Sequence, residues 1–135
     1  MRMIVIGVTG GIGTGKSEAS RYLQKLGASL IDADKVGHSV YLPGTQGWKE
    51  VIQAFGEDIL LPNQEVDRRK LGPIVFTDPK AREKLNAITH PKIRERVNEL
   101  IQEHKELGTR AVIVEAAILI EANWTDLVDE VWVTI

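Results

Sequence analysis

Residues 10 to 17 read Gly-Gly-Ile-Gly-Thr-Gly-Lys-Ser, a complete G-x-x-x-x-G-K-[ST] pattern that is typical of loops binding polyphosphates. An apolar run over residues 3 to 8 precedes this pattern, and a helical pattern follows it. The glycines allow successive backbone N–H groups to face one phosphate chain, and the start of the helix adds partial positive charge. Lys16 can then reach the β- and γ-phosphates of ATP, and the Ser17 hydroxyl can ligate Mg²⁺. The alternative, a glycine-rich turn that binds nothing, fits these flanking elements poorly.

Acidic residues follow two of the expected strands. Asp32 and Asp34 lie two apart in a segment that we expect to be extended, so both side chains should project to the same side. Beside a phosphate loop, one carboxylate could accept the proton of an attacking hydroxyl, while the other holds Mg²⁺ through water or orients the acceptor. Either one could instead cap a helix beginning near Lys35. Glu115 ends a later strand and could approach the metal shell or be a partly solvated strand end.

The elements that must position these residues alternate as in an α/β fold. We expect a short strand at 28–31 and two buried parallel strands at 111–114 and 130–135. Strands punctuated by helices, with the phosphate loop after the first strand, imply a mainly parallel sheet with ligands at the carboxyl edge.

Helical periodicity fills most of the remaining chain. After the loop, one apolar helical face is predicted, and Gly27 should end this helix; the face consists of Ala19, Tyr22, Leu23 and Leu26. Between Gly37 and about Gly108, we expect one helix to start at Thr77-Asp78-Pro79 and the next at His90-Pro91. The apolar stripe expected in that next helix comprises Ile93, Val97, Leu100, Ile101 and Leu107.

Composition narrows the classes of function. The chain has 135 residues, of which 43% are apolar, and a formal charge of −2, so it should form one domain. This charge favours neither nucleic acid nor an anionic membrane as a partner. Cysteine is absent, and no apolar run approaches the length of a membrane span, so we expect a cytoplasmic protein. The three tryptophans, Trp48, Trp124 and Trp132, should pack in the core or the subdomain rather than stack on bases.

Four further segments follow the loop in a recognisable order: IDAD at 31–34, VDRRKL at 66–71, LNAITHP at 85–91 and ILIE at 118–121. With the loop, their order and approximate spacing resemble those of the dephospho-coenzyme A kinases over residues 3 to 135. The resemblance implies transfer of the ATP γ-phosphate to the ribose 3′-hydroxyl of dephospho-coenzyme A. It also implies a three-layer P-loop NTPase-like fold with a mainly parallel sheet. The core would be 1–39 and 109–135, with a helical coenzyme A subdomain inserted at about 40–108.

The same resemblance assigns roles to individual residues. The ATP phosphates would contact Gly11, Gly13, Thr14, Gly15, Lys16, Ser17 and Glu18. Asp34 would be the catalytic base, with Ser17 as the protein ligand of Mg²⁺. Acceptor-binding residues would be Asp32, Arg68, His90 and Arg94. His90 could instead merely cap a helix, and the two arginines could be ordinary surface charges.

Two departures from the family accompany this resemblance. The segment 115–124 lacks the proline of many bacterial members and is more similar to the domain of bifunctional animal coenzyme A synthases, although Glu121 is kept. The sequence ends at Ile135, before the arginine-bearing lid of the family, so we expect the 135 residues alone to bind Mg·ATP weakly without turnover. We also expect Val131, Trp132 and Val133 to be insufficiently buried, because the helix that covers this strand in the family is missing. The alternatives are another small-molecule kinase of the shikimate or gluconate type, and a non-catalytic nucleotide-binding module. No oligomeric state is predicted.

Overall fold

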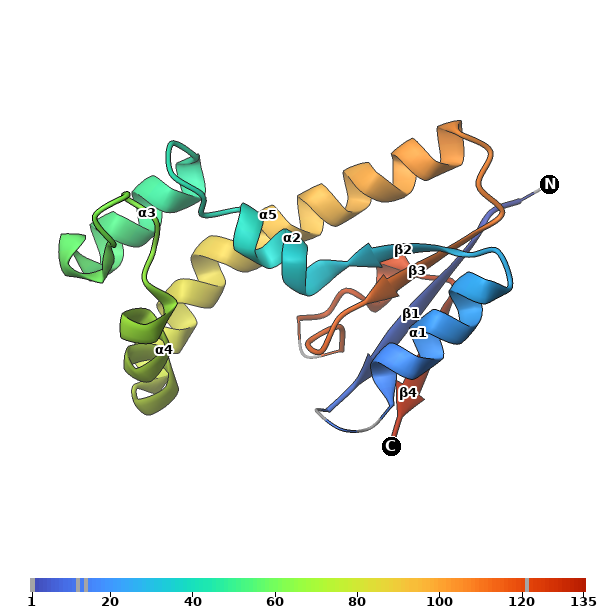
Figure 1. Cartoon of the computed structure of the whole chain (residues 1–135), viewed down its shortest axis with the longest axis horizontal. Helices are drawn as coiled ribbons and strands as arrows, with labels where there is room; N and C mark the ends of the chain where they lie inside the picture. Colours follow the sequence, from blue (N-terminus) through green and yellow to red (C-terminus); the bar gives the residue numbers. More distant parts are fainter. Residues whose placement is uncertain (1, 12, 14, 121) are drawn as a thin grey trace. The chain divides into compact units, whose positions relative to one another are not determined.

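The computed structural model describes every residue except 1, 12, 14 and 121 (Figure 1). It divides into two compact units. One consists of residues 1–36 and 94–135, and the other of residues 37–93. Two helices, α2 (Ala33–Ser39) and α5 (Pro79–Glu106), begin in one unit and end in the other. None of the described helices combines the length and apolar character needed to cross a membrane.

A four-stranded parallel sheet forms the centre of the first unit. Its strands are β1 (Ile4–Gly10), β2 (Ser29–Asp32), β3 (Ala111–Glu115) and β4 (Glu130–Thr134), in the spatial order β2-β3-β1-β4. The register pairs Ile4 with Ala111, Ser29 with Val112, and Ile6 with Glu130. The strands predicted from apolar runs are therefore confirmed, as is their parallel pairing. All four carboxyl ends reach the same edge of the sheet (Figure 1).

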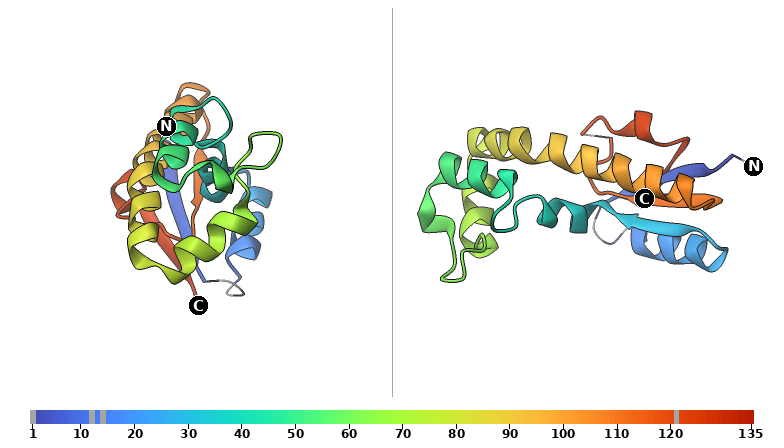
Figure 2. Two further views of the ribbon diagram at one scale, coloured as in Figure 1. Left: turned by 90° about the vertical axis from the view of Figure 1, so that its left-hand side faces the viewer. Right: turned by 90° about the horizontal axis from the view of Figure 1, so that it is seen from above.

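Helices cover both faces of this sheet. α1 (Lys16–Lys25) lies on one face, and residues 94–106 of α5 lie on the other (Figure 2). Leu23 packs with Ile6, Val8 and Ile113 in the core beneath α1. The predicted apolar face of α1 is wrong in part, because the side chains of Tyr22 and Leu26 are largely exposed. The helix contacts the sheet through a narrower stripe, and Gly27 follows its end with φ +104°, as predicted.

β4 is poorly covered, as expected for the 135 residues alone. It is an edge strand that pairs only with β1 among the described strands, and its Val131, Trp132 and Val133 are exposed. The prediction that Trp132 belongs to the core is therefore wrong. Trp124 is buried as predicted, and Trp48 packs against the core of the second unit.

The second unit is helical. It contains α3 (Gln46–Phe55), a short 3₁₀ helix η1 (Glu57–Ile59) and α4 (Arg68–Thr77). Its core is formed by Val51, Ile59, Val66 and Leu71. Side-chain caps start two of these helices: Thr45 Oγ1 accepts the Trp48 N–H at 3.1 Å, and Asp67 Oδ1 accepts the Arg69 N–H at 3.0 Å.

The predicted helix boundary at His90-Pro91 is wrong. α5 starts at Pro79 as predicted, but it continues through Pro91 to Glu106 as one helix of 28 residues. Proline removes the N–H that would otherwise bond to the Ala87 carbonyl oxygen, so α5 continues with one hydrogen bond fewer in its ladder. The predicted stripe is confirmed at Ile93, Val97 and Ile101, which are buried, whereas Leu107 lies beyond the helix and is exposed.

Candidate functional site

The glycine-rich loop joins the end of β1 to the start of α1. Gly13 and Gly15 have φ values of +80° and +88°, in the left-handed region that glycine adopts without a steric penalty. Gly15 is the N-cap residue of α1, and no side chain of a described residue caps this helix start. Gly11, Gly13 and Glu18 are exposed, whereas Thr14 lies outside the described residues. Among the described residues, the backbone N–H groups of this helix start therefore have no side-chain acceptor.

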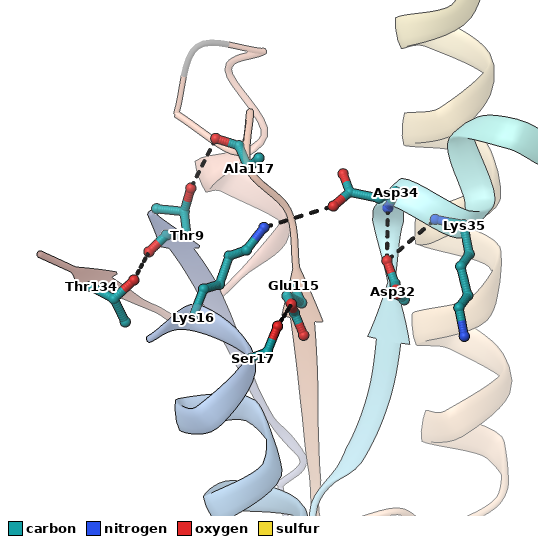
Figure 3. Close-up of polar contacts among 9 residues, drawn as sticks. All are labelled: Thr9, Lys16, Ser17, Asp32, Asp34, Lys35, Glu115, Ala117 and Thr134. Carbon is teal, nitrogen blue, oxygen red and sulfur yellow. Dashed lines mark hydrogen bonds and ion pairs between the residues drawn. The ribbon is translucent and has the colours of Figure 1, made fainter. Parts of the chain in front are cut away.

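Hydrogen bonds fix the end of β1 just before the loop. The buried Thr9 donates through Oγ1 to the Ala117 carbonyl oxygen at 3.2 Å (Figure 3). Its own carbonyl oxygen accepts a hydrogen bond from Thr134 Oγ1, also at 3.2 Å. The end of β1, where the loop begins, is thus hydrogen-bonded both to the segment that follows β3 and to β4.

Lys16 and Asp34 face one another across the site. Lys16 Nζ lies 3.7 Å from Asp34 Oδ2, an ion pair that joins the first turn of α1 to the first turn of α2 (Figure 3). The Lys16 side chain is 15% exposed and that of Asp34 55%. A cation suited to phosphate and a solvent-accessible carboxylate are therefore neighbours.

Asp32 and Asp34 do not share an extended segment, so that prediction is wrong. β2 ends at Asp32 and α2 begins at Ala33, which places Asp34 in the first helical turn. Asp32 Oδ1 accepts the N–H groups of Asp34 at 3.0 Å and Lys35 at 3.2 Å. The capping alternative is thus confirmed for Asp32, and the Asp34 carboxylate is left to pair with Lys16.

Ser17 and Glu115 form a second polar contact at the carboxyl end of the sheet. The Ser17 hydroxyl donates to Glu115 Oε1 at 3.4 Å, and Glu115 is buried at the end of β3. The alternative of a partly solvated strand end for Glu115 is therefore wrong. No group of three or more His, Cys, Asp or Glu within the described part of the chain could hold a metal ion by itself.

Two of the predicted acceptor-binding residues lie in the helical unit. Arg68 is exposed as the first residue of α4. His90 is half-buried in the middle of α5, so the alternative that it caps a helix is wrong. Burial lowers the pKa of His90 below its ordinary value.

Arg94 belongs to the unit of residues 1–36 and 94–135, and it forms a bidentate ion pair. Its Nη1 and Nη2 lie 2.9 and 2.5 Å from Oδ1 and Oδ2 of Asp126, which belongs to the 3₁₀ helix η2 (Thr125–Leu127). The hydrogen bond to Asp126 raises the pKa of Arg94, and the reciprocal bond lowers the pKa of Asp126. Asp126 lies 32 residues along the chain from Arg94, and no motif in the sequence indicated this pairing.

Comparison with known proteins finds a matching family and similar sequences. The family model described as dephospho-CoA kinase matches residues 4–135. The dephospho-CoA kinase of Geobacter sulfurreducens is 49% identical over 131 residues, which cover 97% of this chain and 66% of that protein. That of Geobacter metallireducens is 47% identical over 131 residues, covering 97% of this chain and 65% of that protein. The chain thus spans about two thirds of the length of these curated relatives.

Solved structures share the fold. A protein from Thermus thermophilus matches with a TM-score of 0.79 at 28% identity, over 99% of this chain and 66% of that one. The dephospho-CoA kinase from Campylobacter jejuni matches with a TM-score of 0.69 at 29% identity, over 87% of this chain and 59% of that one. The P-loop NTPase-like fold class predicted from the sequence is confirmed.

Proposed function

Because the chain belongs to the dephospho-CoA kinase family, we propose that its residues transfer the γ-phosphate of ATP to the ribose 3′-hydroxyl of dephospho-coenzyme A. The observation that carries this proposal is the 3.7 Å ion pair between Lys16 and Asp34. It brings a phosphate-binding cation and a candidate base together beside a glycine-rich loop. A cytoplasmic location is retained as part of the proposal.

The loop and the start of α1 would bind the ATP phosphates. The positive φ values of Gly13 and Gly15 suit a turn whose N–H groups face inward, and α1 lacks a side-chain cap that would compete for them among the described residues. Lys16 would contact the β- and γ-phosphates. Thr14 and the backbone of Glu18 complete the predicted set.

Ser17 and Glu115 fit a magnesium site. A hydroxyl and a carboxylate are hard oxygen ligands, and Mg²⁺ at kinase sites is held by one or two such groups together with substrate phosphates. Their contact at 3.4 Å and the burial of Glu115 place both groups at one point beside the loop. When bound, Mg²⁺ neutralises charge on the β- and γ-phosphate oxygens.

Asp34 would act as the base. The 3′-hydroxyl oxygen forms a bond to the γ-phosphorus, the bond from that phosphorus to the β–γ bridging oxygen breaks, and the hydroxyl proton passes to the Asp34 carboxylate. In the absence of nucleotide, this carboxylate pairs with Lys16. Engagement of Lys16 by phosphates would leave the carboxylate able to accept a proton. Phosphoryl transfer depends mainly on alignment and charge neutralisation, so a carboxylate of ordinary basicity suffices.

Arg68, His90 and Arg94 remain the proposed acceptor-binding residues. Arg68 is exposed and has no described carboxylate within ion-pair distance, which supports a role toward an anionic substrate. Arg94 would have to exchange Asp126 for substrate, because its guanidinium is already engaged on two nitrogens. For Asp32, capping supports an indirect role through the position of Asp34 rather than direct substrate contact.

The proposed binding of ATP can be tested with the 135-residue chain. Lys16→Ala should weaken ATP binding about ten- to hundredfold in calorimetry, because it removes a charge-assisted contact. Circular dichroism should remain that of the parent. Unchanged ATP affinity would refute the assignment of Lys16.

The transfer itself is tested with a panel of acceptors. In a version of the protein extended to the full length of its relatives, dephospho-coenzyme A should be phosphorylated in preference to shikimate or gluconate. In the same version, Asp34→Asn should lower turnover about a hundredfold or more while ATP affinity stays within threefold. Glu95→Gln is a matched control, since Glu95 is an exposed carboxylate with no side-chain contact to a described residue. Turnover of Asp34→Asn within threefold of the parent would place the base elsewhere.

A further inference from the structure

A buried hydroxyl extends the contact between β1 and the chain that follows β3. In the sheet, Val8 is the last residue of β1 to pair with β3, and its partner is Glu115. The N–H of Ala116 then donates to the Val8 carbonyl oxygen at 3.0 Å. The next residue along is held by a side chain, because Thr9 Oγ1 donates to the Ala117 carbonyl oxygen at 3.2 Å (Figure 3). The Thr9 hydroxyl therefore keeps the end of this segment against β1.

The two candidate magnesium ligands reach Thr9 by different paths along the chain. The glycine-rich loop starts directly after Thr9 and leads to Ser17, and the segment bound by the Thr9 hydroxyl starts directly after Glu115. Ser17 Oγ lies 3.4 Å from Glu115 Oε1, so this separation depends on how both paths are held. Mg²⁺ requires near-ideal octahedral geometry with ligands at about 2.0 to 2.1 Å. A small displacement of Glu115 would therefore weaken its binding.

The surroundings of Thr9 indicate what the loss of its hydroxyl would do. Thr9 is 4% exposed, whereas Ala117 is an exposed residue. Without the hydroxyl, the Ala117 carbonyl oxygen can turn toward water, and the segment after Glu115 is released from β1. The link between β1 and β4 is separate, since it joins the Thr9 carbonyl oxygen to Thr134 Oγ1 at 3.2 Å. The loss would thus act on the Glu115 side of the site.

We propose that Thr9 is a positioning residue, whose hydrogen bond to Ala117 holds the Glu115 carboxylate where it can bind Mg²⁺ together with Ser17. The inference rests on the proposed function, which supplies the magnesium site. Thr9 itself contacts neither the metal nor the nucleotide in this assignment. Groups that orient metal ligands typically change metal affinity about ten- to hundredfold when they are lost, and a single neutral hydrogen bond accounts for about two- to tenfold.

Calorimetry with Mg·ATP and with ATP in EDTA tests this role in the 135-residue chain. Thr9→Val keeps the branched shape and removes the donor, so it should weaken binding of Mg·ATP about three- to thirtyfold. Binding of ATP in EDTA should stay within about twofold of the parent. Thr9→Ser keeps the donor and should bind Mg·ATP within about twofold of the parent. If Thr9 only filled the core, the order of the two variants would be reversed, and the proposal would fail.

Thr134→Val is the matched control. It removes a hydroxyl that forms a hydrogen bond of the same length at the same strand end, but on the side of β4. Its Mg·ATP affinity should stay within about twofold of the parent. Equal losses for Thr9→Val and Thr134→Val would mean that general loosening of β1 is responsible, and the positioning role would be refuted. Urea denaturation checks that each variant is folded.

Amide exchange of the nucleotide-free chain gives a readout that needs no ligand. The Ala116 N–H should exchange about three- to tenfold faster in Thr9→Val than in the parent, because its segment is no longer held. The Asp129 N–H donates to the Val5 carbonyl oxygen near the other end of β1, at 2.7 Å, and should exchange at the parent rate. Equal acceleration at both amides would contradict the inference.

Glu115→Gln separates this inference from the proposed function. If Glu115→Gln weakens binding of Mg·ATP more than binding of ATP in EDTA while Thr9→Val does not, the positioning role is refuted and the magnesium site stands. If neither variant distinguishes Mg·ATP from ATP in EDTA, the magnesium site and the role of Thr9 both fail.

Discussion

Asp32 offers a test of how the candidate base is held. Its Oδ1 accepts the N–H groups of Asp34 at 3.0 Å and Lys35 at 3.2 Å, at the start of the seven-residue helix α2. Replacing a capping side chain by alanine costs about 0.5 to 2 kcal/mol, and losing its charge at a helix start costs about 0.3 to 1 kcal/mol more. We therefore expect Asp32→Ala to lower the free energy of unfolding by about 1 to 3 kcal/mol. Asparagine caps nearly as well as aspartate, so Asp32→Asn should lose only the charge contribution.

Urea denaturation and amide exchange measure these effects. With an m-value of about 2 kcal/mol/M, the midpoint should fall by about 0.5 to 1.5 M in Asp32→Ala and by less than about 0.5 M in Asp32→Asn. The amide protons of Asp34 and Lys35 should exchange faster in the alanine variant only, because only that variant lacks an acceptor.

Measuring Mg·ATP binding distinguishes a helix-capping role of Asp32 from direct contact of its carboxylate with metal or substrate. A capping role predicts that Asp32→Asn binds Mg·ATP as tightly as the parent does. If the asparagine variant loses as much stability or as much Mg·ATP affinity as the alanine variant, the carboxylate charge itself contacts metal or substrate. The capping argument would then be refuted.

Three further predictions concern other residues of the site and of α5. Glu115→Gln and Ser17→Ala should each weaken binding of Mg·ATP more than binding of ATP in EDTA, and calorimetry showing equal losses would contradict the magnesium site. Burial lowers the folded-state pKa of His90 below its unfolded value of about 6.5, so the unfolded chain binds more protons, and stability is lost as pH falls through this range. In urea titrations at pH 7.5 and 6.0, His90→Gln should reduce this loss, and an unchanged loss would contradict the burial argument. Pro91→Ala restores an N–H inside α5 and should raise the free energy of unfolding, measured by urea denaturation, by about 1 to 2 kcal/mol. A decrease would show that the proline ring is needed for packing.

Local signals in the sequence were sufficient for the loop and the strands. The spacing of Gly10 to Ser17 requires positive φ values and a following helix, and both are present. The apolar runs at 28–31 and 111–114 correspond to β2 and β3 with shifts of one residue at their ends. These features depend on residues close together in the chain, so their pattern predicts them directly.

Features that depend on distant partners were not predictable in this way. Proline is a helix-start signal, but the buried residues on both sides of Pro91 lie in one continuous helix α5, which depends on tertiary packing rather than on the local signal. The start of α2, by contrast, is local: aspartate is common both at strand ends and at helix caps, so the sequence left both interpretations of Asp32 open, and the structure shows the cap. The pairing of Arg94 with Asp126 depends on tertiary contacts across 32 residues, for which periodicity gives no signal.

The register of β1 has a consequence for synthesis on the ribosome. β1 pairs Ile4 with Ala111 and Ile6 with Glu130, so more than 100 residues must be translated after β1 before a neighbouring strand exists. At about 5 to 20 residues per second, the apolar edge of β1 stays unpaired for about 5 to 20 seconds. The core of the 37–93 unit, by contrast, is made by residues at most a few dozen positions apart and can form during that interval. Until β3 emerges, β1 is therefore open to non-native strand pairing.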